Sequence, residues 1–163
     1  MPPKSTVQYR FGDLLALARQ SWITQMAHGL RAMGYGEYRR TDAAVMRLLQ
    51  RGPMPVGRLG DALGVTRQAA RKVAQGLERR GLATAARDNR DSRQVNITLS
   101  GDGEAYARAV VTVIERLNRD LCRRVDPAQL AGADAVLRAV LADEHTRALA
   151  AYLPVPPSAR GSG

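Results

Sequence analysis

The sequence predicts a mainly α-helical protein that carries one small β-hairpin. Apolar residues recur at spacings of three and four over most of the chain, which is the period of an amphipathic helix. Between residues 82 and 99 the period changes to two, which is the period of a strand. The chain has one Phe, one Trp and five Tyr among 163 residues, so we expect a core of Leu, Val, Ala and Ile.

The first predicted helix spans residues 8–33 and follows a frayed start at 1–7. Its end is predicted at Gly34 and Gly36, because glycines destabilise a helix and favour turns. The apolar positions that define its buried stripe are Leu14, Leu15, Ala18, Trp22, Met26 and Leu30.

Residues 41–81 predict three further helices. The first begins at Thr41, a good N-cap residue, and ends before Pro53. The second covers residues 55–63, and the third begins at Thr66 and ends at Gly81. The last two are joined by a short turn that contains Gly64, so this segment has the form of a helix-turn-helix.

Two strands are predicted next, at residues 82–86 and 95–99, around a polar tip at 87–94. Ser100 is expected to cap a long helix over 101–124, and Pro127 stands at the tolerated first position of a last helix. The Pro/Gly/Ser-rich tail at 154–163 is expected to be disordered. The apolar face predicted for the last helix consists of Leu130, Val136, Leu137, Val140, Leu141 and Leu149.

The formal net charge is +10, and 25 residues are basic, 23 of them Arg. This excess favours a polyanionic partner, most often nucleic acid, although a basic protein without such a partner is the alternative. A genomic preference for Arg codons would also explain the Arg content. Residues 41–100 hold eleven basic and five acidic residues, which concentrates the charge on the helix-turn-helix and the hairpin.

The helix that begins at Thr66 is predicted to have one apolar and one polar face. An Arg can donate two hydrogen bonds to guanine, and a Gln can pair with adenine in the same way. The alternative is that this face is only solvated. The residues expected on the polar face are Thr66, Arg67, Gln68, Arg71, Lys72 and Gln75, and those expected inside are Ala70, Val73, Ala74 and Leu77.

The hairpin tip carries Arg90, Asp91 and Arg93. An Arg on a hairpin fits the narrow minor groove, where the negative potential is concentrated. We expect Asp91 to hold such an Arg in a fixed pose by a charge-assisted bond. A solvated loop whose charges only maintain solubility is the alternative.

Four runs of residues together resemble the MarR family: LGDALGVTRQAARKV at 59–73, LERRGL at 77–82, DNRDSR at 88–93 and ITLSGDG at 97–103. The resemblance implies a winged helix-turn-helix fold, with the second helix of the motif in a major groove and the hairpin, or wing, in the flanking minor groove. It places Arg67, Gln68 and Arg71 in the major groove and matches Asp91 and Arg93 to the wing. Asn89 and Ser92 depart from the family pattern.

The resemblance also implies a homodimer whose N- and C-terminal helices intertwine. The expected division is therefore an N-terminal dimerisation helix (1–40), a winged helix-turn-helix domain (41–100), C-terminal dimerisation helices (101–153) and a tail (154–163). The implied function is a sequence-specific regulator, usually a repressor, that binds an inverted-repeat operator on double-stranded DNA. A nonspecific architectural DNA-binding protein and a helical interaction protein are the alternatives.

Many members of the family release DNA when a small molecule binds between the dimerisation helices and the winged domain. Trp22, His28 and Tyr38 are the candidates for such an effector site, in a region that also holds Met26, Tyr35 and Met46. Trp22 and Met26 stand at helical spacing, which is more typical of a core. For His28 and the tyrosines a structural role is the alternative.

The sequence gives little support for a redox, metal-binding or enzymatic function. Cys122 is the single cysteine, and a structural role is favoured over a redox role because a reactive thiol needs a cationic setting. The two histidines, His28 and His145, have no metal-ligand spacing, and no nucleophile motif or phosphate loop is present. We therefore expect no enzyme, cofactor or metal. A cytoplasmic location is expected, since no signal segment or membrane span is evident.

Overall fold

The computed structural model describes residues 10–91, 93–141 and 143. The chain divides into two compact units, Met1–Tyr38 and Arg39–Gly163. Among the described residues of the first unit, helix α1 spans Phe11–Ala32. Its C-terminus closes with the two bonds of a Schellman motif, from the Gly34 N–H to the Arg31 carbonyl and from the Tyr35 N–H to the Leu30 carbonyl. Gly34 has a φ of 91°, which this motif requires.

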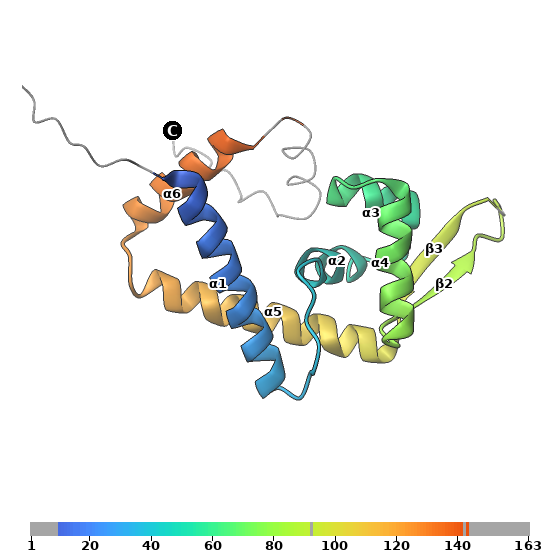
Figure 1. The fold of residues 1–163 in the computed structure, drawn as a ribbon. Coiled ribbons are helices and arrows are strands. Elements are labelled where there is room, and N and C mark those ends of the chain that lie inside the picture. Colours follow the sequence, from blue (N-terminus) through green and yellow to red (C-terminus); the bar gives the residue numbers. More distant parts are fainter. Residues whose placement is uncertain (1–9, 92, 142, 144–163) are drawn as a thin grey trace, which may run out of the picture. The chain divides into compact units, whose positions relative to one another are not determined.

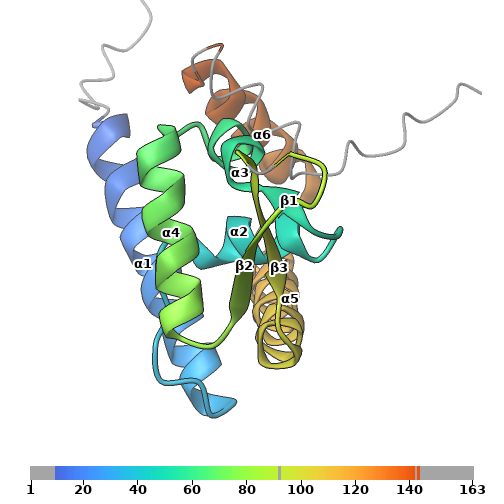
Figure 2. The same cartoon turned by 90° about the vertical axis from the view of Figure 1, so that its right-hand side faces the viewer.

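The second unit contains a winged helix-turn-helix followed by two helices, as the sequence predicts (Figure 1). Strands β1, β3 and β2 form an antiparallel sheet in that order. Figure 2 shows the β2–β3 hairpin beside α4, and α4 and β2 are in contact. The elements are α2 (Asp42–Leu49), β1 (Met54–Pro55), α3 (Val56–Leu63), α4 (Arg67–Arg79), β2 (Ala83–Arg87), β3 (Val95–Leu99), α5 (Gly101–Cys122) and α6 (Pro127–Val140).

Strand β1 is the element that the sequence does not predict. It pairs Met54 with Ile97 and Pro55 with Asn96 across β3. Two residues are too few to show the alternation of a strand, and one of them is a proline, which lacks the N–H that a ladder uses. The pairing exists because the end of α2 brings this segment against β3.

The helix-turn-helix depends on two glycines and one threonine. Gly64 ends α3 with a φ of 65°, in the left-handed region. A Cβ at Gly60 would lie 3.3 Å from the Cβ of Ala70, so this glycine permits the close approach of α3 and α4. Thr66 caps α4 by accepting a hydrogen bond from the Ala69 N–H at 3.2 Å, which confirms its predicted role.

Thr41 is the N-cap residue of α2, as the sequence predicts, but its hydroxyl does not perform the capping. Thr41 has helical backbone angles, and its side chain makes no cap bond. Asp42 turns the chain instead, because its carboxylate accepts a hydrogen bond from the Arg39 N–H at 3.0 Å. An aspartate bonding back to the backbone offers the chain the same local turn that a capping hydroxyl would.

The core of the second unit lies between α2, α5 and the inner face of the sheet, where helices α2 and α5 pack against each other. Ile97 of β3 and Leu59 of α3 are fully buried there. Leu63, which the sequence predicts inside, is only half-buried. The core is aliphatic as expected, apart from Tyr106; its other fully buried members include Val45, Met46, Leu48, Val110 and Val113.

The described part of α6 has no buried residue. Pro127 stands in its first turn, as predicted, and a capping box that the sequence analysis did not predict joins Asp126 and Gln129. The predicted apolar face is present but uncovered in this single chain. Val136, Leu137 and Val140 are 49%, 45% and 53% exposed. Leu149 and the tail at 154–163 lie outside the described residues.

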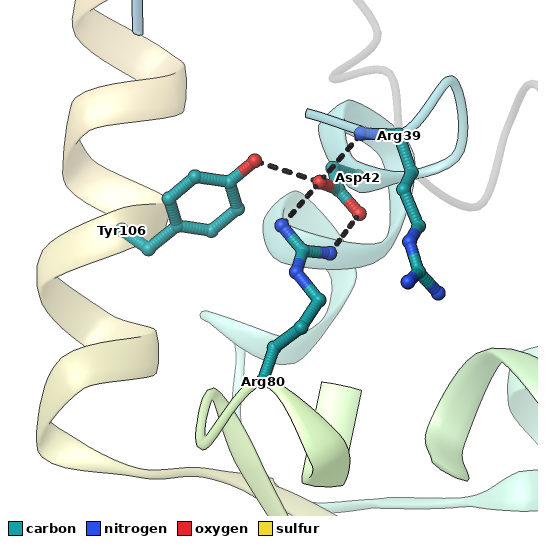
Figure 3. A network of polar contacts seen from close by, with 4 residues as sticks. All are labelled: Arg39, Asp42, Arg80 and Tyr106. Carbon is teal, nitrogen blue, oxygen red and sulfur yellow. Dashed lines mark hydrogen bonds and ion pairs between the residues drawn. The ribbon is translucent and has the colours of Figure 1, made fainter. Parts of the chain in front are cut away.

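A buried polar cluster joins α2, the end of α4 and α5 (Figure 3). Asp42 is 2% exposed, and Arg80 binds both of its oxygens at 3.0 and 2.9 Å. The Tyr106 hydroxyl donates to the same carboxylate at 2.7 Å. The Arg80 guanidinium also lies 5.2 Å from the centroid of the Tyr106 ring, within cation–π range.

The contacts within the cluster determine which of its side chains are charged. Burial and the hydrogen bond to Asp42 raise the pKa of Tyr106, so its hydroxyl stays a donor. Burial acts to lower the pKa of Arg80, but its bonds to Asp42 and Tyr106 outweigh burial and raise it. A charged arginine and a neutral tyrosine therefore both donate to the carboxylate.

We predict that Arg80→Ala lowers the free energy of unfolding by about 3–5 kcal/mol, because it leaves a buried carboxylate without its cation. Urea denaturation followed by circular dichroism measures this loss. Arg79→Ala is the matched control, since Arg79 is exposed and adjacent in sequence; it should change stability by less than about 0.5 kcal/mol. Equal effects of the two substitutions would contradict the structural role of Arg80.

Candidate nucleic-acid interface

Helix α4 presents a polar face to solvent. All six residues that the sequence places on this face, from Thr66 to Gln75, are exposed in the structure. Ala70, Ala74 and Leu77 are buried on the opposite side, and Val73 is half-buried. Glu78 is turned towards the hairpin, where its carboxylate accepts a hydrogen bond from the Ala85 N–H at 3.0 Å. The remaining outer face of α4 is thus available to a partner.

A basic cleft separates α4 from the wing; we call it the wing-side cleft. Its volume is about 220 Å³. It brings Arg67 and Arg71 of α4 together with Arg93 of the hairpin, three residues that the sequence selects. Arg58 of α3 also lines it, and the sequence reading missed this residue. Asp61 is the one acidic residue among the described residues that line this cleft.

Lys72 does not lie with these arginines. It lines a different cleft, of about 240 Å³, between α4 and the start of α2, which we call the α2-side cleft. Arg39, Arg40 and Gly76 line the same cleft. Sequence reasoning missed Arg39 and Arg40, although two adjacent arginines directly before a helix were a visible signal.

Asp88 organises the tip of the wing. Its carboxylate accepts hydrogen bonds from the N–H groups of Arg90 and Asp91 at 2.7 and 3.2 Å, and from the Asn96 side chain at 2.8 Å. The two backbone bonds, together with the one from Asn96, lower the pKa of Asp88. The sequence reading missed this role, although an aspartate at the end of a strand is a common turn former.

The predicted bond between Asp91 and an arginine side chain is wrong in the described part of the wing. The Asp91 carboxylate accepts a hydrogen bond from the Arg93 N–H at 2.9 Å, so it fixes the backbone and not the guanidinium. An exposed guanidinium gains little from a nearby carboxylate, whereas the bond to the adjacent backbone closes a tight turn. Arg90 is exposed at the tip, and Ser92 lies outside the described residues.

The candidate effector residues belong to the first unit. Trp22 is half-buried and His28 is exposed on α1, and Tyr38 is half-buried in the segment that follows. Met26 and Met46 are fully buried, as core residues are. A ligand role for Trp22, His28 and Tyr38 stays a prediction.

Other site types gain no support from the described residues. Cys122 is exposed in the last turn of α5, so burial within this chain does not account for it. No group of three potential metal ligands occurs among the described side chains. None of the described helices is long and apolar enough to cross a membrane.

Residues 39–94, from the start of the second unit through most of the hairpin, match the family model of the MarR family. This segment belongs to the MarR family. No curated protein matches the sequence.

Solved structures extend the likeness beyond the MarR segment. A probable transcriptional regulator from Pseudomonas aeruginosa is 25% identical, with a TM-score of 0.65, over 80% of this chain and 96% of the other. The PcaV transcriptional regulator from Streptomyces coelicolor, solved with its natural ligand, is 22% identical, with a TM-score of 0.68, over 80% of this chain and 91% of the other.

A third similar structure contains DNA. The transcriptional repressor CouR, bound to a 23-mer DNA duplex, is 19% identical, with a TM-score of 0.68, over 80% of this chain and 91% of the other. At these identities PcaV and CouR support the fold. The family match, together with the regulator from Pseudomonas aeruginosa, shows that the chain is similar to transcriptional regulators of the MarR family.

We predict that Asp88→Ala loosens the wing tip. The backbone amides of Arg90 and Asp91 should exchange with solvent faster, because they lose their shared acceptor. Amide hydrogen exchange measures this change. A folded-state pKa below the ordinary value means that the ordering is present above about pH 4 and is lost as the pH falls further. Asp61→Ala, outside the tip, should leave these amides unchanged; unchanged exchange in Asp88→Ala would contradict the assignment.

Proposed function

We propose that the chain is a homodimeric regulator, a repressor as is usual in the family, which binds an inverted-repeat operator in a sequence-specific way. The observation that carries the proposal is the wing-side cleft, which gathers Arg67 and Arg71 of α4 with Arg93 of the hairpin. Helix and wing therefore present their cations to one partner. Thr66 and Gln68 add polar groups on the exposed face of α4, and Lys72 adds a cation on its other flank. Arg90 and Asp91 belong to the tip of the wing.

The exposed apolar residues support a dimer. Leu121 at the end of α5 is 41% exposed, and Leu14 and Leu17 of α1 are 60% and 68% exposed. Like the uncovered face of α6, these side chains expose apolar surface that a dimer interface would bury. We therefore assign residues 1–40 and 101–153 to dimerisation and residues 41–100 to DNA binding. A regulator of this kind acts in the cytoplasm, where the DNA is.

We further propose that a small molecule releases the DNA. A ligand-bound regulator of the same fold, PcaV, supports this part of the proposal. The residues we assign to the effector site are Trp22, His28 and Tyr38, which offer an aromatic surface and polar groups to a small organic molecule.

The proposal is tested by selecting bound sequences from a random DNA pool at near-physiological salt. We expect a two-fold symmetric motif with half-sites about one helical turn apart, because a symmetric dimer spaces its two α4 helices in this way. A featureless pool that still binds would replace this proposal by an architectural role. Recovery of no DNA would contradict both.

We predict that Arg71→Ala weakens binding to the selected operator by about 1–3 kcal/mol per half-site and relaxes the preference at one base pair. Fluorescence anisotropy against operator variants measures both effects. Arg108→Ala is the charge-matched control, because Arg108 is exposed on α5 and lines neither basic cleft. Wild-type affinity in Arg71→Ala would remove this residue from the interface.

We predict that Arg93→Ala changes the flanks of the operator and not its centre. An arginine in a narrow minor groove gains from the concentrated negative potential, so its loss should remove protection there. Hydroxyl-radical footprinting compares the flanking and central positions. A footprint identical to that of the wild type would exclude Arg93 from the interface.

A further inference from the structure

Gly76 is an unfavourable residue for the interior of α4, because glycine lowers the stability of a helix. It lies within α4, is buried, and costs roughly 0.5–1 kcal/mol of stability relative to alanine. A Cβ at this position would lie 2.7 Å from Arg39 Nη1 and 3.9 Å from Arg79 Nη2. The missing side chain therefore leaves room for the Arg39 guanidinium, and a second guanidinium approaches the same point.

The backbone of Arg39 is held by the buried cluster. Its N–H donates to the Asp42 carboxylate at 3.0 Å, and its carbonyl accepts a hydrogen bond from the Asp42 N–H at 2.9 Å. Figure 3 shows the Arg39 side chain extending away from this carboxylate. The cluster thus anchors the base of the side chain, and its guanidinium lies against α4 at Gly76.

The α2-side cleft is cationic as a result. Arg39, Arg40 and Lys72 line it, and Arg79 approaches it at Gly76. Asp42 is the one acidic residue among the described residues of its lining, and Arg80 binds both of its carboxylate oxygens. A lining in which cations outnumber carboxylates favours an anionic partner.

The cleft lies on the flank of α4 opposite the wing-side cleft. Successive residues of a helix are about 100° apart, which places Lys72 and Arg79 on one side of the exposed face and Arg67 and Arg71 on the other. The two clefts agree with this division, since Lys72 lines one and Arg67 and Arg71 line the other. A helix roughly 10–12 Å wide fills a major groove about 12 Å wide, so its two flanks face the two phosphate backbones.

We propose that Arg39, Arg40, Lys72 and Arg79 form a phosphate-binding site for the DNA backbone on the side of the major groove away from the wing. The inference rests on the proposed function, because it assumes that α4 enters a major groove. Such a site positions the helix without reading bases. Its ligand is the phosphodiester oxygens, to which guanidinium groups donate paired hydrogen bonds.

Gly76→Ala tests the site without changing any charge. The added methyl group collides with the flexible end of Arg39, so the guanidinium moves while the helix gains a better former. We expect thermal stability equal to or above that of the wild type, together with weaker binding to operator and random DNA alike. Wild-type affinity in this variant would count against a contact between the Arg39 guanidinium and DNA.

Arg39→Ala tests the site by removing a charge. We expect binding to fall roughly 2- to 30-fold, the range for losing one exposed ion pair at each of two half-sites. The slope of log K against log salt concentration should become shallower by about 0.9 for each phosphate that the protein no longer neutralises. Ethylation interference should vanish at one backbone position in each half-site. Arg108→Ala, which removes the same charge from α5, should change none of these.

The controls separate this inference from the proposed function. If the wild type selects a symmetric operator while Gly76→Ala and Arg39→Ala keep its affinity, salt slope and interference pattern, the phosphate site is wrong and the function stands. If these variants lose affinity only for the operator and not for random DNA, the cluster reads bases and the inference is also wrong. If the wild type binds no DNA, both are wrong.

Discussion

The Asp42 carboxylate is the constraint on which the arrangement of the DNA-binding unit depends. It stands at the start of α2 and is almost fully buried. It accepts four hydrogen bonds: one from the Arg39 N–H, one from each of the two terminal nitrogens of Arg80, and one from the Tyr106 hydroxyl. Three of these bonds end on Oδ2 and one on Oδ1, so both oxygens of the buried carboxylate have hydrogen-bond donors. One side chain thereby joins the beginning of α2, the end of α4 and the first half of α5.

A second joint reinforces the first at the beginning of α5. The Ser100 hydroxyl donates to the Gly81 carbonyl at 2.6 Å and accepts a hydrogen bond from the Gly103 N–H at 3.0 Å. A Cβ at Gly103 would overlap the Leu82 carbonyl oxygen, so α5 docks directly on the backbone that follows α4. Helix α5 continues from this joint to Cys122, and Leu121 in its last turn is exposed. A displacement of α5 would therefore carry the end of α4 with it.

Local chemistry explains which parts of this structure could be predicted from the sequence. The caps at Thr66 and Ser100, the glycine that ends α3 and the two hairpin strands each depend on a few neighbouring residues, and they are where the sequence places them. The Asp42–Arg80–Tyr106 cluster joins positions 38 and 64 residues apart, and no local pattern indicates that these side chains meet. The same reason explains why β1 was not predicted, since its partner strand β3 is distant in the sequence.

The candidate interface also has a part that the sequence predicts and a part that it does not. Exposure on α4 follows from helical period, so Arg67, Gln68, Arg71 and Lys72 could be selected directly. Their separation into two clefts could not, because it depends on where the wing and the start of α2 meet the helix. Asp91 shows a further limit: the sequence indicates a carboxylate beside arginines, but not that the carboxylate accepts a hydrogen bond from the backbone N–H of Arg93.

Some residues that lower the stability of the fold also line the two clefts beside α4. Gly76 makes α4 less stable than alanine would, and the guanidinium groups of Arg39 and Arg79 approach it. On the other flank, Arg58, Arg67, Arg71 and Arg93 line a single cleft with one carboxylate among the described residues. A sequence selected for stability alone would favour alanine at position 76 and alternate its surface charges. Both departures become favourable when a polyanion lies along the two flanks of α4, as the proposed binding to DNA requires.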